Sequence, residues 1–377
     1  METTNREGRA ISWRVAKGWL VAMAAVFALS SCETLKDIFD EEPSMGNVIM
    51  PEGPPPEWAP DIDPQMLAVI EQLQSYGTPP LHTLTADQAR KAPTPTDAVM
   101  DLLKKYNITP PQPKVDFNHL VIPNNTDEGL LVRTYTPRSG NGPFPVIVYY
   151  HGGGWVIAGL DTYEPSAAAL AEKTGAIVVS VAYRQAPEHT FPAAHEDAYA
   201  AYVWARENAG QINGNPDKVA TAGESAGGNL AVAVAIMAKE RGMELPVHIL
   251  SVYPIAEGDT ESSTYDKYAD AVPLNRPLME WFFNKYVPDE TNRMSPLITL
   301  TDADLTGLPP VTIINAEIDP LEAEGEILAE VLKMAGVDVT RKVYAGVTHE
   351  FFGMAAVLEQ ARHAQDLAAS RLKESFK

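Results

Sequence analysis

The sequence predicts an α/β protein with a mainly parallel sheet of eight strands and helices on both faces of that sheet. Short apolar runs rich in β-branched residues alternate with segments whose apolar residues recur at helical spacing. Strands joined by helical crossovers pair in parallel, because the crossover returns the chain to the same end of the sheet. A chain of 377 residues, 45% of them hydrophobic, has enough apolar surface for such a core.

The first segment, residues 1–31, resembles a bacterial lipoprotein signal peptide. Basic residues precede an apolar run from Trp19 to Leu29, which is too short for a helix to span a bilayer core of roughly 30 Å. The run ends in Leu-Ser-Ser-Cys, which resembles the cleavage box after which the cysteine becomes the lipidated first residue. We therefore expect a lipid anchor on Cys32 and a place in the bacterial envelope, at the outer membrane or the periplasmic face. A secretory peptide cut elsewhere and a short amphipathic anchor are the alternatives.

Residues 32–60 are acidic, rich in proline and without periodicity, which predicts a tether. Cys32 is the only cysteine, so no disulfide can form within the chain. The formal charge of −21 argues against a nucleic-acid partner, because phosphate binding requires a basic surface.

A folded domain is expected from residue 61 to residue 377. It opens with two amphipathic helices, 63–74 and 94–106, each preceded by Asp or Thr at the capping position. Strands are then expected at residues 115–123, 129–137, 146–150, 176–183, 218–223, 247–254, 310–317 and 339–346. Helices are expected between or after them at residues 163–174, 193–209, 226–241, 320–335 and 351–374.

A long insertion interrupts this alternation between Tyr253 and Pro310. Its apolar helical stretch, "RPLMEWFFNKYV", lies in residues 257–300. Insertions at the carboxyl ends of parallel strands lie where ligands bind. We therefore expect residues 61–112 and 257–300 to form a helical cap over the site, although each helix could equally be an ordinary core-packing helix.

The strongest chemical signal is the G-x-S-x-G element Gly223-Glu224-Ser225-Ala226-Gly227. It follows a predicted strand and opens a predicted helix, which is the setting of a nucleophile elbow. So sharp a turn requires small residues two positions before and two positions after the serine. Ser225 is the predicted nucleophile.

A serine hydroxyl needs a base, and the base needs an acid that holds it in one tautomer. Among the histidines after the serine, His248 lies in a predicted strand and His363 in a predicted helix, which leaves His349 as the base. Asp319 follows a buried strand and is the predicted acid, with Glu317 as the alternative. Taken alone, His349 reads as a solvated loop residue and Asp319 as a helix cap.

The glycines of "HGGGW" follow an earlier strand, where this arrangement requires an oxyanion loop. Glycine lets the backbone come within hydrogen-bond distance of the substrate oxygen. The predicted oxyanion donors are the amides of Gly152, Gly153, Gly154 and Ala226, with Gly153 and Gly154 favoured in the loop. No Lys-Ser/Thr signature or G-x-G-x-x-G spacing follows, which excludes a phosphate-binding loop.

Residues 60–377 resemble the bacterial hormone-sensitive-lipase-like esterases (family IV) of the α/β-hydrolase fold. The resemblance rests on the order and approximate spacing of "HGGGW", "VAYRQAPEHTFPAAHEDAYAAYVW", "GESAGGNLA", "AEIDPLEAEGE" and "YAGVTHEFFGM". It implies a cap-bearing carboxylic ester hydrolase with no metal and no cofactor, and a Ser225, Asp319 and His349 triad. It also implies that His151 and residues 184–191 brace the oxyanion loop. Glu224 departs from the usual Asp or Thr of the family, and Gln185 from the usual Leu.

The expected function is hydrolysis of short- to medium-chain carboxylic esters through a covalent acyl-enzyme. The small-molecule ester and the membrane are the expected partners, and the sequence gives no oligomeric state. An amidase, peptidase or deacetylase using the same triad is the alternative among enzymes. A non-catalytic binding protein on the same fold is the alternative outside them.

Overall fold

The computed structural model describes residues 49–110 and 112–377. The predicted signal peptide, Cys32 and the first part of the predicted tether lie outside the described residues. None of the helices in the described part of the chain is both long and apolar enough to cross a membrane.

The compact unit begins at Ile49, earlier than the boundary expected at residue 61. Ile49 and Ala59 are buried, and the Glu71 carboxylate accepts hydrogen bonds from the amides of Glu52 and Gly53 at 2.6 and 2.7 Å. Residues 49–60 form no helix or strand, and a side chain of the following helix holds them in place. Their sequence therefore shows no periodic pattern. Composition alone therefore extended the predicted tether too far.

The sheet has eight strands in the order β1-β2-β4-β3-β5-β6-β7-β8, which confirms the predicted fold class. Strands β1 and β2 form an antiparallel hairpin, β2 pairs antiparallel with β4, and every other pairing is parallel. The strands are β1 (Val115–Ile122), β2 (Leu130–Pro137), β3 (Phe144–Tyr150), β4 (Ile177–Val181), β5 (Gly214–Glu224), β6 (Ile249–Val252), β7 (Val311–Ile318) and β8 (Val339–Thr348).

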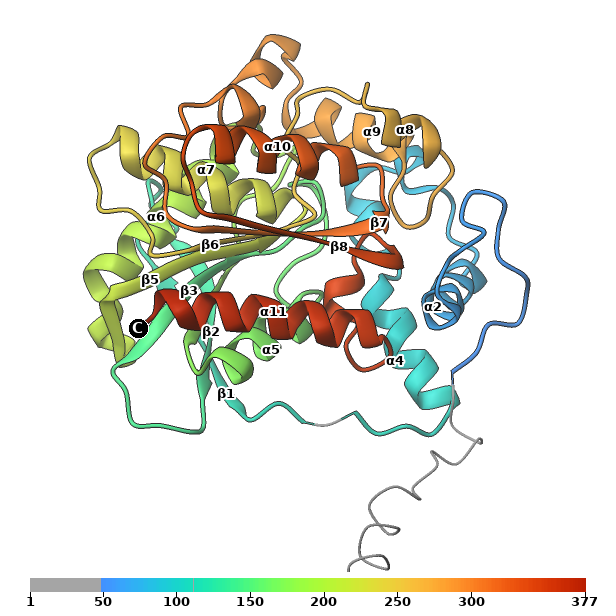
Figure 1. The fold of residues 1–377 in the computed structure, drawn as a ribbon, viewed down its shortest axis with the longest axis horizontal. Coiled ribbons are helices and arrows are strands. Elements are labelled where there is room, and N and C mark those ends of the chain that lie inside the picture. Colours follow the sequence, from blue (N-terminus) through green and yellow to red (C-terminus); the bar gives the residue numbers. More distant parts are fainter. Residues whose placement is uncertain (1–48, 111) are drawn as a thin grey trace, which may run out of the picture. The chain divides into compact units, whose positions relative to one another are not determined.

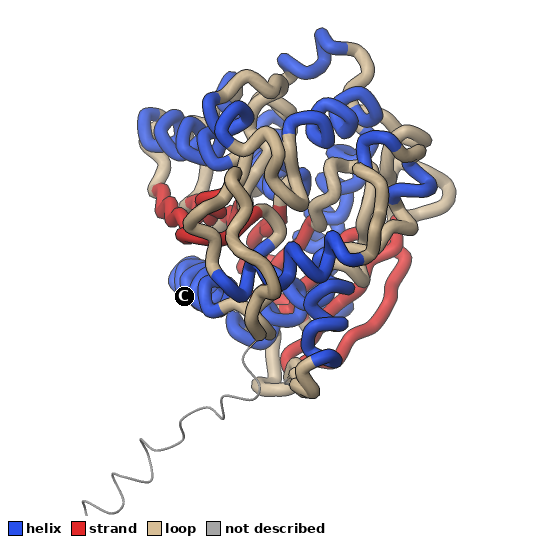
Figure 2. The backbone as a smooth tube through the Cα atoms, turned by 90° about the vertical axis from the view of Figure 1, so that its right-hand side faces the viewer, coloured by secondary structure: helices blue, strands red, loops and turns tan. Residues whose placement is uncertain are grey.

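Helices cover both faces of the sheet (Figures 1 and 2). Helices α6 (Ala193–Asn208), α7 (Ala226–Glu240) and α10 (Glu322–Met334) pack on one face, and α5 (Glu164–Thr174) and α11 (Glu359–Ser375) on the other. The remaining helices are α2 (Pro64–Ser75), α3 (Ala86–Ala89), α4 (Pro95–Lys105), α8 (Ser263–Lys267) and α9 (Arg276–Tyr286). Short 3₁₀ turns are η1 (Leu81–Thr83), η2 (Ala209–Ile212), η3 (Glu290–Met294), η4 (Leu300–Asp302) and η5 (Phe351–Gly353).

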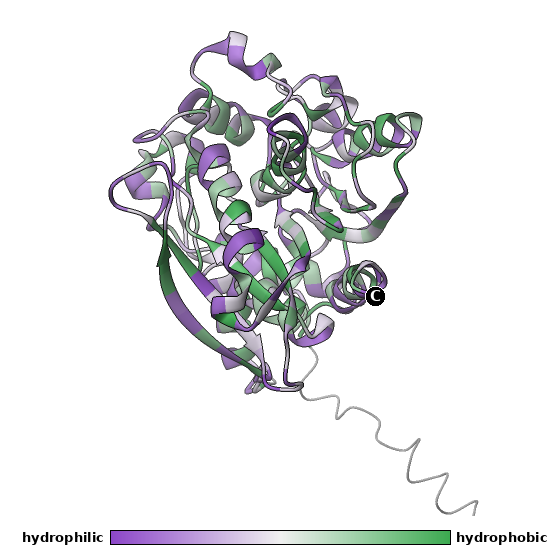
Figure 3. Cartoon of the chain, turned by 90° about the vertical axis from the view of Figure 1, so that its left-hand side faces the viewer, coloured by the Kyte–Doolittle hydropathy of each residue, from purple (hydrophilic) through white to green (hydrophobic). Residues whose placement is uncertain are grey.

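Alternate residues of the central strands serve two separate apolar cores. In β3, Val146 and Val148 face the layer of α6 and α7, whereas Ile147 and Tyr149 face the layer of α5 and α11. Figure 3 shows the apolar ribbon concentrated in the interior. Burial on both faces explains why these strands read as continuous apolar runs.

The capping residues expected for the first two long helices lie where the sequence predicts them. The Asp63 side chain accepts from the amides of the second and third residues of α2, and Thr94 forms a capping box with Asp97 at the start of α4. The helix expected at residues 351–374 is wrong at its start, because α11 begins only at Glu359. Phe351 and Phe352 are apolar because they fill the core from a 3₁₀ turn, not because they continue the helix.

Candidate active site

Ser225 occupies a strained turn between β5 and α7. Its φ is 58° and its ψ −119°, an unusual conformation for a residue with a side chain. A Cβ added at Gly223 would lie 2.1 Å from the carbonyl oxygen of Gly227, and one added at Gly227 would lie 2.0 Å from that of Tyr150. The two glycines of G-x-S-x-G therefore permit the turn, which leaves the serine hydroxyl at the carboxyl end of the sheet.

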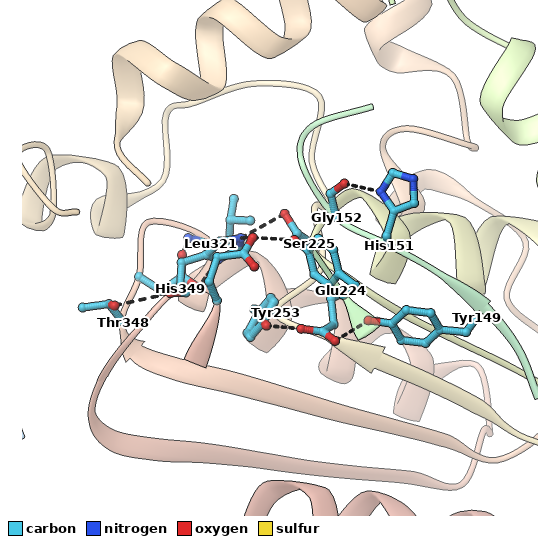
Figure 4. A network of polar contacts seen from close by, with 12 residues as sticks. Tyr149, His151, Gly152, Glu224, Ser225, Tyr253, Leu321, Thr348 and His349 are labelled. Carbon is cyan, nitrogen blue, oxygen red and sulfur yellow. Dashed lines mark hydrogen bonds and ion pairs between the residues drawn. The ribbon is translucent and has the colours of Figure 1, made fainter. Parts of the chain in front are cut away.

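Three predicted residues form one continuous chain of polar contacts. His349 Nε2 lies 2.9 Å from Ser225 Oγ (Figure 4), and His349 Nδ1 lies 2.7 Å from Asp319 Oδ2. All three side chains are buried. Asp319 follows β7 and His349 follows β8, so the carboxyl ends of neighbouring parallel strands bring residues 94 and 124 positions away to Ser225.

The surroundings of His349 favour its protonated form. Burial lowers the pKa of this imidazole, but the charge of Asp319 and its hydrogen bond outweigh burial, so the pKa of His349 is raised from 6.5. Asp319 Oδ1 also accepts from the Leu321 amide at 2.9 Å, which fixes the orientation of the carboxylate. The helix-capping role considered for Asp319 is wrong, because the N-cap residue of α10 is Leu321 and no side chain forms a capping hydrogen bond there.

The residues considered as alternatives lie away from Ser225. His248 contacts Thr312 and Ser375, each at 3.0 Å, and His363 is exposed on α11. Glu317 Oε2 accepts from the Gly346 amide at 2.9 Å and so holds the β8 segment.

Residues 151–159 after β3 form a glycine loop, in which Gly153 and Gly154 lie in the left-handed region at φ 91° and 58°. Within the described residues, the amides of Gly153 and Gly154 donate to no protein acceptor. Ala226 is the first residue of α7, and a helix provides no acceptor for its first amides. These amides are therefore available to an oxygen bound beside Ser225.

Close approach of a substrate does not by itself explain the glycines. A Cβ on Gly153 would lie 2.3 Å from the Ile157 carbonyl oxygen, and one on Gly154 would lie 2.1 Å from Phe282 Cγ of α9. The protein itself fills the space where side chains would project. Any substitution here would disturb folding as well as substrate binding, which the sequence does not reveal.

Side chains from distant segments hold the glycine loop in place. The Tyr183 hydroxyl donates to the His151 carbonyl at 2.8 Å, and Gln185 Nε2 donates to the Ile157 carbonyl at 2.8 Å. Arg90, at the end of α3, donates to the Val156 carbonyl at 2.8 Å and pairs with Glu188. The bracing expected from His151 and residues 184–191 is thus accompanied by Arg90, for which the sequence carries no signal.

A cavity of about 310 Å³ opens beside Ser225 and His349. Its walls come from the glycine loop, from residues between 81 and 95, and from residues between 273 and 282. No residue of α2 lines it. Leu274, Leu278 and Phe282 provide an apolar wall, whereas Glu350 brings a carboxylate into the same space. The volume and the mixed lining suit a small organic molecule with a polar centre.

Glu224, next to Ser225, is buried between two phenols. The hydroxyls of Tyr149 and Tyr253 each donate to one of its carboxylate oxygens (Figure 4). Burial, with the charge of Glu350, raises the pKa of Glu224 to about 7. The ring centroids of Tyr253 and His349 lie 4.5 Å apart, so Glu224 contacts the histidine indirectly, through the Tyr253 side chain that it binds. Glu224 does not line the cavity.

We expect Glu224→Gln to stabilise the protein at alkaline pH. The carboxyl has a pKa of about 7 when folded and an ordinary value of 4.5, so ionisation costs the folded state about 3 kcal/mol above pH 7 and little near pH 5. Glutamine keeps the shape and removes that cost, and each phenol can donate or accept a hydrogen bond. Thermal melts of both proteins from pH 5 to pH 9 measure the effect. Parallel profiles would mean that Glu224 does not titrate between its ordinary value and pH 7.

No group of three His, Cys, Asp or Glu side chains is arranged as metal ligands within residues 49–110 and 112–377.

Known proteins are similar to this chain over most of its length. Residues 147–353 match the protein family described as the alpha/beta hydrolase fold. Carboxylesterase NlhH of Mycobacterium tuberculosis is 36% identical over 323 residues, which cover 84% of this chain and 97% of that protein. This protein belongs to the hormone-sensitive-lipase-like esterases of the α/β-hydrolase fold. Its predicted class, a carboxylic ester hydrolase, is thereby confirmed.

Solved esterases of this family have the same fold. An esterase of Pyrobaculum calidifontis is 35% identical, with a TM-score of 0.72 over 83% of this chain and 98% of that chain. A thermostable esterase of Pseudomonas putida is 29% identical, with a TM-score of 0.78 over 85% of this chain and 99% of that chain. The similarity spans nearly the whole length of both relatives.

Proposed function

We propose that this esterase hydrolyses short- to medium-chain carboxylic esters with Ser225 as nucleophile, His349 as base and Asp319 as acid. The observation that carries the proposal is the pair of contacts at 2.9 and 2.7 Å that joins the three side chains. The His349 nitrogen nearest Ser225 can take the hydroxyl proton, because Asp319 holds the other nitrogen as a donor.

In the acylation step, Ser225 Oγ attacks the ester carbonyl as His349 Nε2 takes its proton. The carbonyl oxygen becomes an oxyanion, for which the amides of Gly153, Gly154 and Ala226 are the proposed donors, with Gly152 the fourth candidate. A preorganised donor of this kind is worth about 100- to 1000-fold in rate. The protonated imidazole, stabilised by Asp319, then gives its proton to the departing alcohol.

In the deacylation step, water attacks the acyl-enzyme and His349 again takes the proton. The tetrahedral intermediate collapses, the bond between the acyl carbon and Ser225 Oγ breaks, and the serine regains its proton.

Segments 61–112 and 257–300 are the proposed cap that selects the substrate. Residues between 81 and 95 and between 273 and 282 line the cavity, which supports this role. The apolar side chains of Leu274, Leu278 and Phe282 would accept a short alkyl chain.

Matched substrates test the reaction class. We expect the purified protein to hydrolyse p-nitrophenyl butyrate far faster than butyryl p-nitroanilide. Comparable rates would indicate an amidase or peptidase, release of acetate from N-acetylated substrates would indicate a deacetylase, and turnover of none of them would indicate a binding protein.

We propose further that a lipid on Cys32 anchors the enzyme in the bacterial envelope, at the outer membrane or the periplasmic face. The support is the sequence of residues 1–32, with its basic start, apolar run and Leu-Ser-Ser-Cys ending. We expect Cys32→Ser to move the enzyme from the membrane fraction to the soluble fraction or to block its maturation. An intact mass of the wild-type protein without a lipid would rule out the anchor.

A further inference from the structure

Glu350 is the residue directly after the proposed base, and the backbone turns its side chain into the cavity. Its φ of 73° lies in the left-handed region, which residues with a side chain seldom adopt. The side chain is 19% exposed and lines the same cavity as Ser225 and His349. Residues in such strained conformations cluster at functional sites, so Glu350 is a candidate for a role in the reaction.

The carboxylate of Glu350 lies close to the nitrogen that exchanges protons with the serine. Glu350 Oε1 is 3.9 Å from His349 Nε2, too far for a direct hydrogen bond. Two polar atoms at this separation can share one water, at about 2.8 Å from each. The site beside Nε2 is also where a water must lie to lose its proton to His349 during deacylation.

The Tyr163 hydroxyl holds this carboxylate in position. It donates to Glu350 Oε1 at 2.6 Å, and it is the one donor to Glu350 recorded among the described residues. The other charged residues of the cavity are already paired, Arg90 with Glu188 and Asp161 with Arg133. Glu350 therefore keeps acceptor capacity for a molecule inside the cavity.

We propose that Glu350 is a positioning residue for the water that cleaves the acyl-enzyme. The proposal rests on the proposed function above. One hydrogen of the water points to His349 Nε2, and the other is donated to the Glu350 carboxylate. The water oxygen forms a bond to the acyl carbon, its first proton passes to Nε2, and Glu350 keeps its charge throughout. Collapse of the intermediate breaks the bond to Ser225 Oγ, which takes the proton from Nε2.

This arrangement distinguishes the two half-reactions. Neither the serine hydroxyl in acylation nor an alcohol that attacks the acyl-enzyme has a second hydrogen to give to Glu350. The carboxylate should therefore help water and give little help to serine or methanol. Loss of the carboxylate should slow hydrolysis of the acyl-enzyme more than its methanolysis.

The experiment measures kinetics and product partition for the full chain with p-nitrophenyl butyrate and added methanol. For Glu350→Gln we expect kcat and KM to fall together by about 10-fold or more, with kcat/KM nearly unchanged and a burst of p-nitrophenol. The ratio of methyl butyrate to butyric acid should rise by a similar factor. Glu359→Gln is the matched control, because it removes the same charge from an exposed site on α11 and should match the wild type.

Glu350→Gly separates water positioning from an effect of the backbone turn. Glycine adopts the left-handed conformation freely and lacks the carboxylate, so we expect the same rise in the product ratio as for Glu350→Gln. The proposal is overturned if the product ratio of either variant equals that of the wild type. If the wild type forms no acyl-enzyme, or Ser225→Ala keeps full turnover, the proposed function itself fails.

Discussion

Ser225→Ala is expected to lower kcat for p-nitrophenyl butyrate by about 10⁵- to 10⁶-fold. The alanine removes the hydroxyl proposed to form the acyl-enzyme, and neither His349 nor the amides of the glycine loop can replace it. Steady-state assays with the purified variant measure the loss.

The fold should survive this change, which makes the result interpretable. Ser225 contributes its amide to a 2.8 Å hydrogen bond with the Val252 carbonyl, and alanine keeps that bond. We expect the melting temperature of the variant to equal or exceed that of the wild type. The φ of 58° strains alanine as much as serine, and alanine removes the cost of burying a hydroxyl group. Activity within 10-fold of the wild type would exclude Ser225 as the nucleophile.

Asp319→Asn is expected to lower kcat by about 10⁴-fold. The asparagine oxygen can keep the hydrogen bond from the Leu321 amide, which leaves the NH₂ group facing His349 Nδ1. The imidazole must then accept at Nδ1 and carry its proton on Nε2, where it can no longer take the proton of Ser225. This variant changes the tautomer of His349 and keeps a side chain of nearly the same shape at position 319.

The residual activity of Asp319→Asn should also change its pH dependence. The charge of Asp319 raises the pKa of His349, and the base must be neutral to work. Without that charge the pKa falls, so the acid limb of the pH–rate profile should move to lower pH. Glu317→Gln is the control, because Glu317 binds the Gly346 amide and does not contact the histidine. A Glu317→Gln loss as large as that of Asp319→Asn would contradict the assignment of the acid.

Much of the fold was predictable because the central strands are buried on both faces and the helices carry clear caps. The eight strands overlap the eight segments expected to be strands, and Asp63 and Thr94 cap the helices that they were expected to cap. Prediction failed for segments that form no regular helix or strand and are fixed by side-chain contacts. Glu71 binds the amides of Glu52 and Gly53 in the segment 49–60, and residues 351–358 pack into the core without forming a long helix.

The candidate triad was predictable for a related reason. Each of its members follows a strand, and the carboxyl ends of parallel strands meet at one edge of the sheet. Arg90, Tyr163 and Glu350 were not predictable, because they reach the site from segments whose approach depends on tertiary packing. For Glu350, its place next to His349 was the one available hint. The crowding around Gly153 and Gly154 likewise depends on Ile157 and on Phe282, which is distant in the sequence.

The central claim is that Ser225 is the residue that becomes acylated, and covalent labelling tests it most directly. A fluorophosphonate probe incubated with the full chain should add one probe mass, and peptide mass spectrometry should place it on Ser225. Ser225→Ala should take up no probe, and Asp319→Asn should take it up slowly. A wild-type protein that stays unlabelled, or that carries the probe on another residue, would contradict the account.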